Sequence, residues 1–324
     1  NIDLAQIDRL TMVACGTAFY AALTAKYWFE KIARLPVDVD VASEFRYREP
    51  PVKPGTCALF VSQSGETADT LAALRYMASQ DATILSVVNV PESSIARESD
   101  LVLPLHAGVE IGVASTKAFT AQLTVLAVVA FKIAYAKGAI DAAQYRAHIA
   151  ELNRLPGLIS QALGIDGAVQ DISKKLASAR DIIFLGRGAL YPLAMEGALK
   201  LKEISYIHAE GYPSGELKHG PIALIDKNVP VVVMAPMDPL FDKSVSNMQE
   251  VMARSGQVLL ISCKHGLKTA AEGTWAQITM PTTPDLLAPI VYAIPAQLLA
   301  YHTAQAKGTD ADQPRNLAKS VTVE

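Results

Sequence analysis

The stretch TMVACGTAFYAALTAKYWFE, residues 11–30, joins an apolar, β-branched run to a helical pattern through a glycine. Its first five residues predict a buried strand that ends at Gly16, and the remainder predicts the helix that follows. The same order returns 170 residues later, where a second apolar run ends at Gly186. The simplest interpretation is two copies of one α/β unit.

Further strands and helices alternate along the chain, which is typical of parallel sheets covered by helices on both faces. In the first copy we expect strands at 11–15, 57–61, 84–88 and 101–105, and helices at 18–30, 68–79 and 116–135. In the second copy we expect strands at 182–185, 231–235, 258–262 and 277–280, and helices at 193–207 and 286–304. Residues 136–176 are polar and helix-forming, so they would link the copies. The predicted domains are 1–150, 151–304 including the linker helix, and an irregular tail over 305–324.

Composition and charge exclude several classes of protein. The 324 residues are 51% hydrophobic and 19% charged, which is ordinary for a compact globular protein and unlike a disordered chain. The chain carries 29 basic and 32 acidic side chains, a net charge of -3, and has no run of Lys and Arg. Nucleic acid is therefore not an expected partner.

The cysteines and the most apolar segment bear on compartment and membrane. Cys15, Cys57 and Cys263 are too few and too far apart for a disulfide framework or a set of metal ligands. A reducing, cytoplasmic location and no bound metal are expected. The segment Leu123–Ala136 is interrupted by Lys132 and is shorter than the ~20 apolar residues of a membrane span. It predicts a buried helix.

The sequence SQSGET, residues 62–67, lies between a predicted strand and a predicted helix. Backbone N–H groups at a helix N-terminus, together with nearby hydroxyl groups, favour an anion such as a phosphate. Ordinary capping, with Ser64 as N-cap and Thr67 at the third helical position, is the alternative. Open α/β sheets bind ligands at the carboxyl ends of their strands, which favours the phosphate. The second copy has PMDP at 236–239 instead, so only the first copy should hold a phosphate.

No dinucleotide-binding fingerprint is present. The glycine turns Cys15–Thr17 and Gly186–Gly188 do not extend to G-x-G-x-x-G, so no nucleotide cofactor is expected.

Three charged residues share one face of the predicted helix at 193–207. Glu196, Lys200 and Glu203 are spaced by four and three residues. A carboxylate can move a proton between adjacent carbons, and an ammonium can stabilise an enolate oxygen. A solvated, salt-bridged face is the alternative. Apolar neighbours favour burial, and they are Leu199, Leu201 and Ile204.

Two further segments contain candidate catalytic groups. The loop GELKHGP, residues 215–221, places His219 where it can do acid–base work near neutral pH. The tail DQPRNLAKSVTVE, residues 312–324, is too apolar for a loose end, so we expect it to pack back on the body. A lysine held there could form a Schiff base. The segment EIGVASTK, residues 110–117, is explained adequately as a polar helix cap.

These residues resemble the sugar isomerase (SIS) domains of the glutamine:fructose-6-phosphate aminotransferases, also called glucosamine-6-phosphate synthases. The matching segments are ASEFRYR at 42–48, SQSGETADTL at 62–71, EIGVASTKAFT at 110–120, EGALKLKEISYIHAE at 196–210, GELKHGP at 215–221 and DQPRNLAKSVTVE at 312–324. The resemblance implies two flavodoxin-like SIS subdomains and a C-terminal active-site tail. It also implies synthesis of glucosamine 6-phosphate from fructose 6-phosphate and ammonia. The chain begins at Asn1, and no part of it resembles the family's glutaminase domain, so it is expected to be a portion of a longer protein.

The resemblance also implies roles for individual residues. Glu203 would move the proton between C1 and C2 beside Lys200, His219 would open the sugar ring from the neighbouring subunit of a homodimer, and Lys319 would form the Schiff base. The expected phosphate ligands are Ser62, Gln63, Ser64 and Thr67. The other expected substrate contacts are Thr17, Val113, Ser115, Glu196 and Ala318.

The chain departs from the family pattern at Ala18, and two other functions are compatible with the same fold. The family usually has C-G-T-S after the first strand, whereas Ala18 replaces the serine here. Loss of one neutral hydrogen bond would cost ~0.5–1.5 kcal/mol of substrate affinity. A phosphosugar deglycase or isomerase of the same fold would also explain Ala18. A non-catalytic phosphosugar sensor would need the 62–67 loop but would have no use for the three catalytic candidates together.

Overall fold

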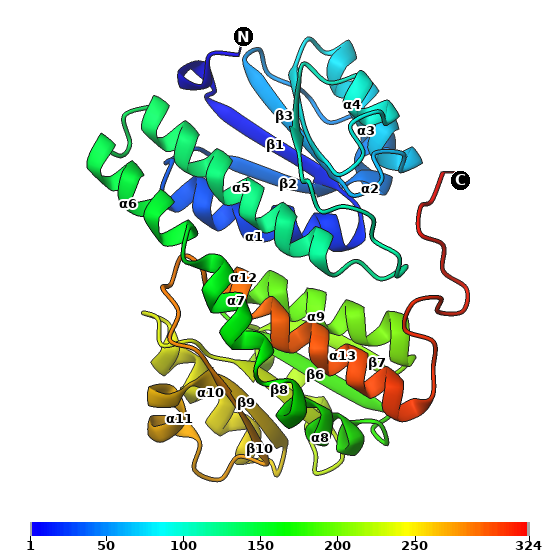
Figure 1. Cartoon of the computed structure of the whole chain (residues 1–324), viewed down its shortest axis with the longest axis vertical. Helices are drawn as coiled ribbons and strands as arrows, with labels where there is room; N and C mark the ends of the chain where they lie inside the picture. The colour runs from blue at the N-terminus through cyan, green and yellow to red at the C-terminus, as the bar shows by residue number, and fades with distance from the viewer. Residues whose placement is uncertain (1, 323–324) are drawn as a thin grey trace. The chain divides into compact units, whose positions relative to one another are not determined.

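The computed structural model describes residues 2–322, and these divide into two compact units (Figure 1). Unit 1 comprises the described parts of Asn1–Ile111, Ser115–Ala150 and Ala318–Glu324. Unit 2 comprises Gly112–Ala114 and Glu151–Leu317. The last described residues of the tail therefore belong to the first unit.

Unit 1 is built on a parallel sheet with the strand order β2-β1-β3-β4-β5. The strands are β1 (Arg9–Ala14), β2 (Val37–Val41), β3 (Thr56–Ser62), β4 (Thr83–Val88) and β5 (Leu101–Pro104). Helices α1 and α5 pack together on one face, and α2, α3 and α4 cover the other. The helices are α1 (Gly16–Lys31), α2 (Ala42–Arg48), α3 (Ala68–Ser79), α4 (Ser94–Arg97) and α5 (Lys117–Ala136), with a short 3-10 turn at Leu4–Gln6. All seven residues of the central strand β3 are buried, which explains its apolar sequence.

Unit 2 repeats this plan with the strand order β10-β9-β8-β6-β7. The strands are β6 (Asp181–Gly186), β7 (His208–Pro213), β8 (Pro230–Met234), β9 (Gln257–Cys263) and β10 (Ala276–Met280). Helices α8, α9 and α13 pack on one face, and α10 lies on the other. The helices are α7 (Leu155–Leu163), α8 (Asp166–Leu176), α9 (Leu190–Ser205), α10 (Phe241–Met252), α11 (Lys264–Ala270), α12 (Ala288–Val291) and α13 (Ala293–Lys307), and the 3-10 helices are η2 (Ser214–His219) and η3 (Pro221–Leu224).

The two sheets have the same topology when β6 is matched to β1. Neighbouring strands in both sheets are parallel, and the order of unit 2 read from β7 is equivalent to that of unit 1 read from β2. This is the flavodoxin-like 2-1-3-4-5 order. The predicted α/β fold with two tandem units is confirmed. The linking segment is helical as predicted, because α6 (Ala142–Leu152), α7 and α8 occupy most of it.

Several elements differ from the sequence-based expectation, and helices α2, α4, α10 and α11 were not predicted. The edge strands β2 and β7 were not predicted, because VDVDV alternates and HAEGYP contains Gly and Pro. The single helix expected over 286–304 is wrong, since the structure has α12 and α13 with Tyr292 between them. Pro295 explains the break, because it has no N–H to donate to the carbonyl of Val291.

Helix α5 is long and apolar, and most of it lies in the core of unit 1. By length and composition alone α5 could cross a membrane, but 61% of its most apolar window is buried in the structure, as in a core helix. The expected burial of Leu123–Ala136 is observed for most of that segment.

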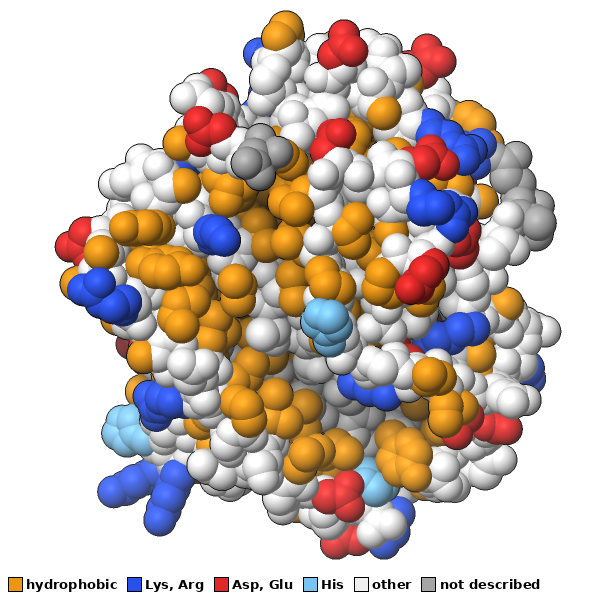
Figure 2. Space-filling view, turned by 45° about the horizontal axis from the view of Figure 1, so that its top comes forward, with side chains coloured by type: hydrophobic (Ala, Val, Ile, Leu, Met, Phe, Trp, Pro, Cys, Tyr) orange, Lys and Arg blue, Asp and Glu red, His pale blue; other side chains and the backbone are white. Residues whose placement is uncertain are grey.

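On the face drawn in Figure 2, Lys and Arg side chains are interspersed with acidic and apolar ones and form no continuous basic surface.

Candidate active site

Most of the candidate binding residues of unit 1 lie at the carboxyl ends of its strands. Thr17 lies in the first turn of α1, directly after β1, and residues 62–67 join the end of β3 to α3. The Thr70 hydroxyl of α3 contacts the sulfur of Cys15 at 3.8 Å, which brings the two loops together. Strand order reverses between β1 and β3, and this is where flavodoxin-like sheets bind their ligands.

The 62–67 loop is a compact turn held by its own hydroxyl groups. Ser62 Oγ accepts from the N–H of Gly65 at 3.0 Å, and Ser64 Oγ accepts from the N–H of Glu66 at 3.2 Å. Gly65 has a φ of +68°, and a Cβ there would lie 2.0 Å from the Oγ of Ser93. Glycine is therefore required at this position.

Glu66 fastens the loop to the next helix. Its Oε1 accepts from the N–H of Ser94 at 2.7 Å. The bonds from the Ser94 backbone and side chain hold the pKa of Glu66 below its ordinary value. The Glu66 carboxylate therefore holds the loop against α4. Its negative charge makes it unsuitable for binding an anion.

The capping alternative for this loop is wrong in its details. Helix α3 begins at Ala68 with Thr67 as its N-cap residue, so Ser64 lies outside the helix. Thr67 makes no side-chain capping bond, which leaves its hydroxyl for other partners. The N–H of Ala68 donates to the carbonyl of Val321 at 3.1 Å, so the tail reaches this helix terminus.

The tail is held on unit 1 by polar contacts rather than by its apolar side chains. The Ser320 hydroxyl contacts that of Ser64 at 3.2 Å. The tail docks on the body as predicted, but Leu317 and Val321 remain 45% and 57% exposed, so these apolar side chains do not hold it. Val323, the other apolar residue of this segment, lies outside the described residues.

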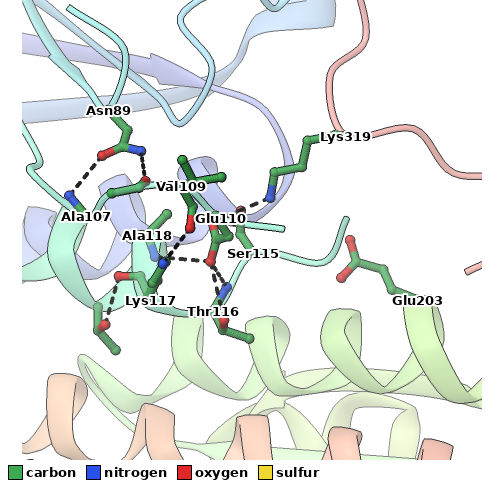
Figure 3. A network of polar contacts seen from close by, with 12 residues as sticks. Asn89, Ala107, Val109, Glu110, Ser115, Thr116, Lys117, Ala118, Glu203 and Lys319 are labelled. Carbon is green, nitrogen blue, oxygen red and sulfur yellow. Dashed lines mark hydrogen bonds and ion pairs between the residues drawn. The ribbon is translucent and has the colours of Figure 1, made fainter. Parts of the chain in front are cut away.

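Glu110 connects the tail lysine to the start of α5 (Figure 3). Its Oε1 accepts from the N–H groups of Thr116 at 2.7 Å and Ala118 at 3.3 Å. Its Oε2 accepts from the hydroxyl of Ser115 at 3.2 Å and lies 3.5 Å from Nζ of Lys319. The sugar-contact candidate Ser115 and the Schiff-base candidate Lys319 therefore meet at one carboxylate.

A cavity of about 660 Å³ in unit 1 opens between these groups, which is ample for a sugar phosphate. Its lining residues come from the 62–67 loop, from the ends of β4 and β5 and from the tail, and they include Gln63, Ser64, Asn89, His106, Glu110 and Lys319. Two of the phosphate-loop candidates, Gln63 and Ser64, thus line the same cavity as the tail amine.

In unit 2, the three charges of α9 form a buried cluster. Nζ of Lys200 lies 2.5 Å from Oε2 of Glu203 and 3.5 Å from Oε1 of Glu196. Glu196 and Lys200 are each 1% exposed, while the side chain of Glu203 is 20% exposed. Burial alone would lower the pKa of Lys200, but the two carboxylates outweigh it and raise that pKa above its ordinary value. Lys200 is therefore an ammonium ion at neutral pH, and Glu203 is the member of the cluster that solvent can reach.

The remaining candidates take different positions. The N–H of Val113 donates to the carbonyl of Asp312 at 2.9 Å, which fixes this backbone against the tail within unit 2. His219 is exposed at the end of η2, and among the described residues its side chain has no hydrogen bond or ion pair. Ala318 is exposed in the tail. Ala18 lies half-buried in the first turn of α1.

Sequence reasoning missed the part played by Glu110. The motif at 110–117 was explained as a cap, but the capping carboxylate lies six residues before Thr116, a spacing outside the usual capping patterns. Ser320 and Asn89 were also missed, since a lone polar residue in a loop gives no local signal. Among residues 2–322, no group of three or more His, Cys, Asp and Glu side chains has the arrangement of a metal site.

The fold and the site together define the class of protein: two flavodoxin-like units, one with a hydroxyl-rich loop at its ligand-binding edge. The family model described as SIS domain matches residues 3–132 and 175–306. The chain belongs to the SIS domain family.

Several named proteins and solved structures are similar to this chain. The chain is 59% identical, over all 324 of its residues, to a glutamine–fructose-6-phosphate aminotransferase [isomerizing] of Zymomonas mobilis, and the match covers 53% of that relative. The chain thus spans about half the length of such relatives. The solved C-terminal domain of glucosamine-fructose-6-phosphate aminotransferase from Francisella tularensis matches with a TM-score of 0.93 and 48% identity over 96% of this chain and 88% of that one. A glucosamine-6-phosphate deaminase from Thermotoga maritima matches with a TM-score of 0.75 and 25% identity over 97% and 90%.

Proposed function

We propose that the chain is the sugar-phosphate half of a glutamine–fructose-6-phosphate aminotransferase, which converts fructose 6-phosphate and ammonia into glucosamine 6-phosphate and water. The observation that carries the proposal is the seating of Lys319 at the cavity that also exposes Gln63 and Ser64. A phosphosugar sensor would have no use for Lys319 together with Glu203 and His219. The 59% identity to relatives that bear this name supports the same function.

The phosphate would be held by the 62–67 loop. Ser62 and Ser64 use their oxygens as acceptors inside the loop, so their hydroxyl hydrogens can still be donated to a ligand. Thr67 and Gln63 would add further polar groups. Around the sugar, the proposed contacts are Thr17, Val113, Ser115 and Ala318.

The chemistry would be shared between an amine and a carboxylate. Nζ of Lys319 adds to C2 of the open-chain ketose, and water leaves as the imine forms. Ammonia then replaces the lysine nitrogen at C2. Glu203 takes a proton from C1 and delivers one to C2, so that C1 becomes an aldehyde while C2 becomes an amine-bearing carbon. The ammonium of Lys200, held by Glu196, would stabilise the oxygen anion that develops between the two steps.

We also propose that His219 opens the sugar ring in the site of a second copy of the chain. Its exposure at the end of η2, with no partner among the described residues, supports this assignment. The test mixes His219→Ala and Lys319→Ala chains after unfolding and refolds them together. Random pairing should restore about a quarter of wild-type activity, because half of the dimers are mixed and each has one intact site. If exchange is demonstrated and no activity returns, the shared site is refuted.

Product analysis tests the proposed reaction. The purified chain is incubated with fructose 6-phosphate and ammonium, with fructose 6-phosphate and glutamine, and with glucosamine 6-phosphate alone. Glucosamine 6-phosphate should form with ammonium only. Release of ammonia from glucosamine 6-phosphate with no synthesis would favour a deaminase, and binding without turnover would favour a sensor.

The free thiols of Cys15, Cys57 and Cys263 support the proposal of a cytoplasmic location.

A further inference from the structure

The carboxyl group of Glu110 is buried, which is costly unless its charge is compensated. The residue is 8% exposed, and its side chain is 3% exposed. An unpaired carboxylate at such a place would lose several kcal/mol of hydration, roughly as expected for buried ions in general. The contacts of Glu110 therefore show what the protein gains from keeping an acid there.

The two oxygens of Glu110 have different partners. Oε1 takes the N–H groups of Thr116 and Ala118 at the start of α5, where the positive end of the helix dipole favours a negative charge. Oε2 takes the hydroxyl of Ser115 and faces Nζ of Lys319. One oxygen thus caps a helix of unit 1, and the other binds the tail.

On its N-terminal side, the segment that carries Glu110 is fixed by bonds that do not involve the tail. The Asn89 amide donates to the carbonyl of Gly108 at 2.8 Å and accepts from the N–H of Ala107 at 2.9 Å. Nζ of Lys117 donates to the carbonyl of Val109 at 2.6 Å. Figure 3 shows these bonds beside Glu110. The carboxylate is therefore a fixed point at the rim of the cavity.

The tail, by contrast, is attached at a few points. Val321 accepts from Ala68, and Ser320 contacts Ser64, so the backbone beside Lys319 is anchored. These contacts do not orient the four-carbon side chain of Lys319, which is 29% exposed. The Glu110 contact directs its amine toward the cavity.

We propose that Glu110 is a positioning residue for the proposed aminotransferase reaction: it directs Lys319 into the cavity and couples docking of the tail to the capped start of α5. The inference rests on the proposed role of Lys319. Glu110 itself need not touch the sugar. A tail that lacks this partner should still bind phosphate at the 62–67 loop but should present its amine poorly.

Glu110→Gln separates the two tasks of this side chain. Glutamine keeps an oxygen that can accept from Thr116 and Ala118, but it has no charge for Lys319. Glu30→Gln is the matched control, since Glu30 makes an exposed ion pair with Lys26 on α1 of the same unit. Borohydride trapping with fructose 6-phosphate at Lys319 should slow roughly 10- to 100-fold in Glu110→Gln. kcat should fall in parallel while KM changes about twofold or less, because substrate binding is retained.

Hydrogen exchange gives a readout that does not depend on turnover. In Glu110→Gln, exchange should speed up at Ala68 and over residues 317–322, where the tail docks, and should stay unchanged at Thr116 and Ala118. Lys319→Met should speed up tail exchange to a similar extent, and the double variant should add little. If Glu110→Gln fails to fold, Lys319→Met still tests whether this ion pair holds the tail.

The outcomes separate the inference from the function on which it rests. Wild-type trapping at a residue other than Lys319 counts against the proposed function, while the exchange experiment still decides whether Glu110 holds the tail. Trapping at Lys319 with unchanged rate and unchanged tail exchange in Glu110→Gln would overturn the inference alone. Equal losses in Glu30→Gln would overturn it as well.

Discussion

The loop after β3 and the loop after β8 occupy equivalent places in their sheets, yet only the first is rich in hydroxyl groups. Residues 62–67 form a turn around Gly65 that leaves hydroxyl hydrogens available. In unit 2, Asp238 closes its own loop instead by accepting from the N–H of Leu240 at 2.8 Å. The two sheets thus share a topology, and their loop sequences support the proposal that unit 1 holds the phosphate.

The helix that follows the first strand of each unit is α1 in unit 1 and α9 in unit 2, and here the buried charges are in unit 2. In unit 1, Lys26 and Glu30 form an exposed pair on α1, 3.6 Å apart. In unit 2, Lys200 is buried on α9 between two carboxylates. A surface pair costs little to form and contributes little, whereas a buried cluster must be compensated within the fold. The two units thus carry different charges at corresponding helices, and the proposed function assigns phosphate binding to unit 1 and proton transfer to Glu203 of unit 2.

Removing the carboxylate of Glu203 should give the largest difference between the two helices. Glu203→Gln keeps the size of the side chain and a contact to Lys200 but cannot accept a proton. We expect turnover of fructose 6-phosphate to fall by roughly 10²- to 10⁴-fold, the usual contribution of general acid–base catalysis. Glu30→Gln on α1 should leave turnover unchanged. Steady-state kinetics on both variants provide the measurement, and a small effect at Glu203 would remove it from the chemistry.

The buried and exposed lysines should also differ in stability. Lys200→Met leaves Glu196 buried without its cation and should cost about 3–5 kcal/mol. Lys26→Met breaks an exposed pair worth about 0.3–0.5 kcal/mol. Urea unfolding of the two variants measures both values, and Glu196→Gln combined with Lys200→Met should recover part of the loss.

The pH dependence of this stability has a defined sign. Because the pKa of Lys200 is raised above its ordinary value of 10.5 on folding, its contribution is complete below that pH. The contribution is lost as the pH rises through the folded-state pKa.

Similar free energies of unfolding for Lys200→Met and Lys26→Met at neutral pH would contradict the argument that burial makes the Lys200 cluster the more costly one to break.

Substitutions in the loops after β3 and β8 should differ in their effect on KM for fructose 6-phosphate, and this effect is the smallest of those expected here. Ser64→Ala and Thr67→Ala should each raise KM for fructose 6-phosphate by about tenfold, since a hydrogen bond to a charged group contributes ~1.5–3 kcal/mol. kcat should change less, because a distant phosphate is bound equally in the ground and transition states. Met237→Ala in the equivalent loop of unit 2 should change neither value. A fall in kcat with unchanged KM would argue against a phosphate site at 62–67.

Much of the fold follows from local patterns, and the failures have physical causes. Helix α3 begins and ends where its sequence predicts, because a polar loop and an apolar face mark it clearly. The edge strands β2 and β7 lack a continuous apolar run, so their pairing partners determine them. Likewise, the division of residues 286–304 depends on Pro295 within an otherwise helical pattern.

The site was predictable in parts. Burial of Glu196 and Lys200 could be expected from their apolar neighbours, and it is observed. Docking of the tail could be expected too, but not its means, since Leu317 and Val321 stay exposed while Ser320 and Lys319 make the contacts. Those partners are more than 200 residues away in sequence, with 256 residues separating Ser320 from Ser64. Contacts at such separations cannot be deduced from local spacing.

Location of the covalent intermediate shows which lysine forms the imine with the substrate. The chain is treated with fructose 6-phosphate and borohydride, digested, and analysed by mass spectrometry, with Lys200→Met and Lys319→Met as controls. The account predicts one sugar-phosphate adduct on Lys319, retained in Lys200→Met and lost in Lys319→Met. An adduct on Lys200, or no adduct in a chain that forms glucosamine 6-phosphate, would contradict the account.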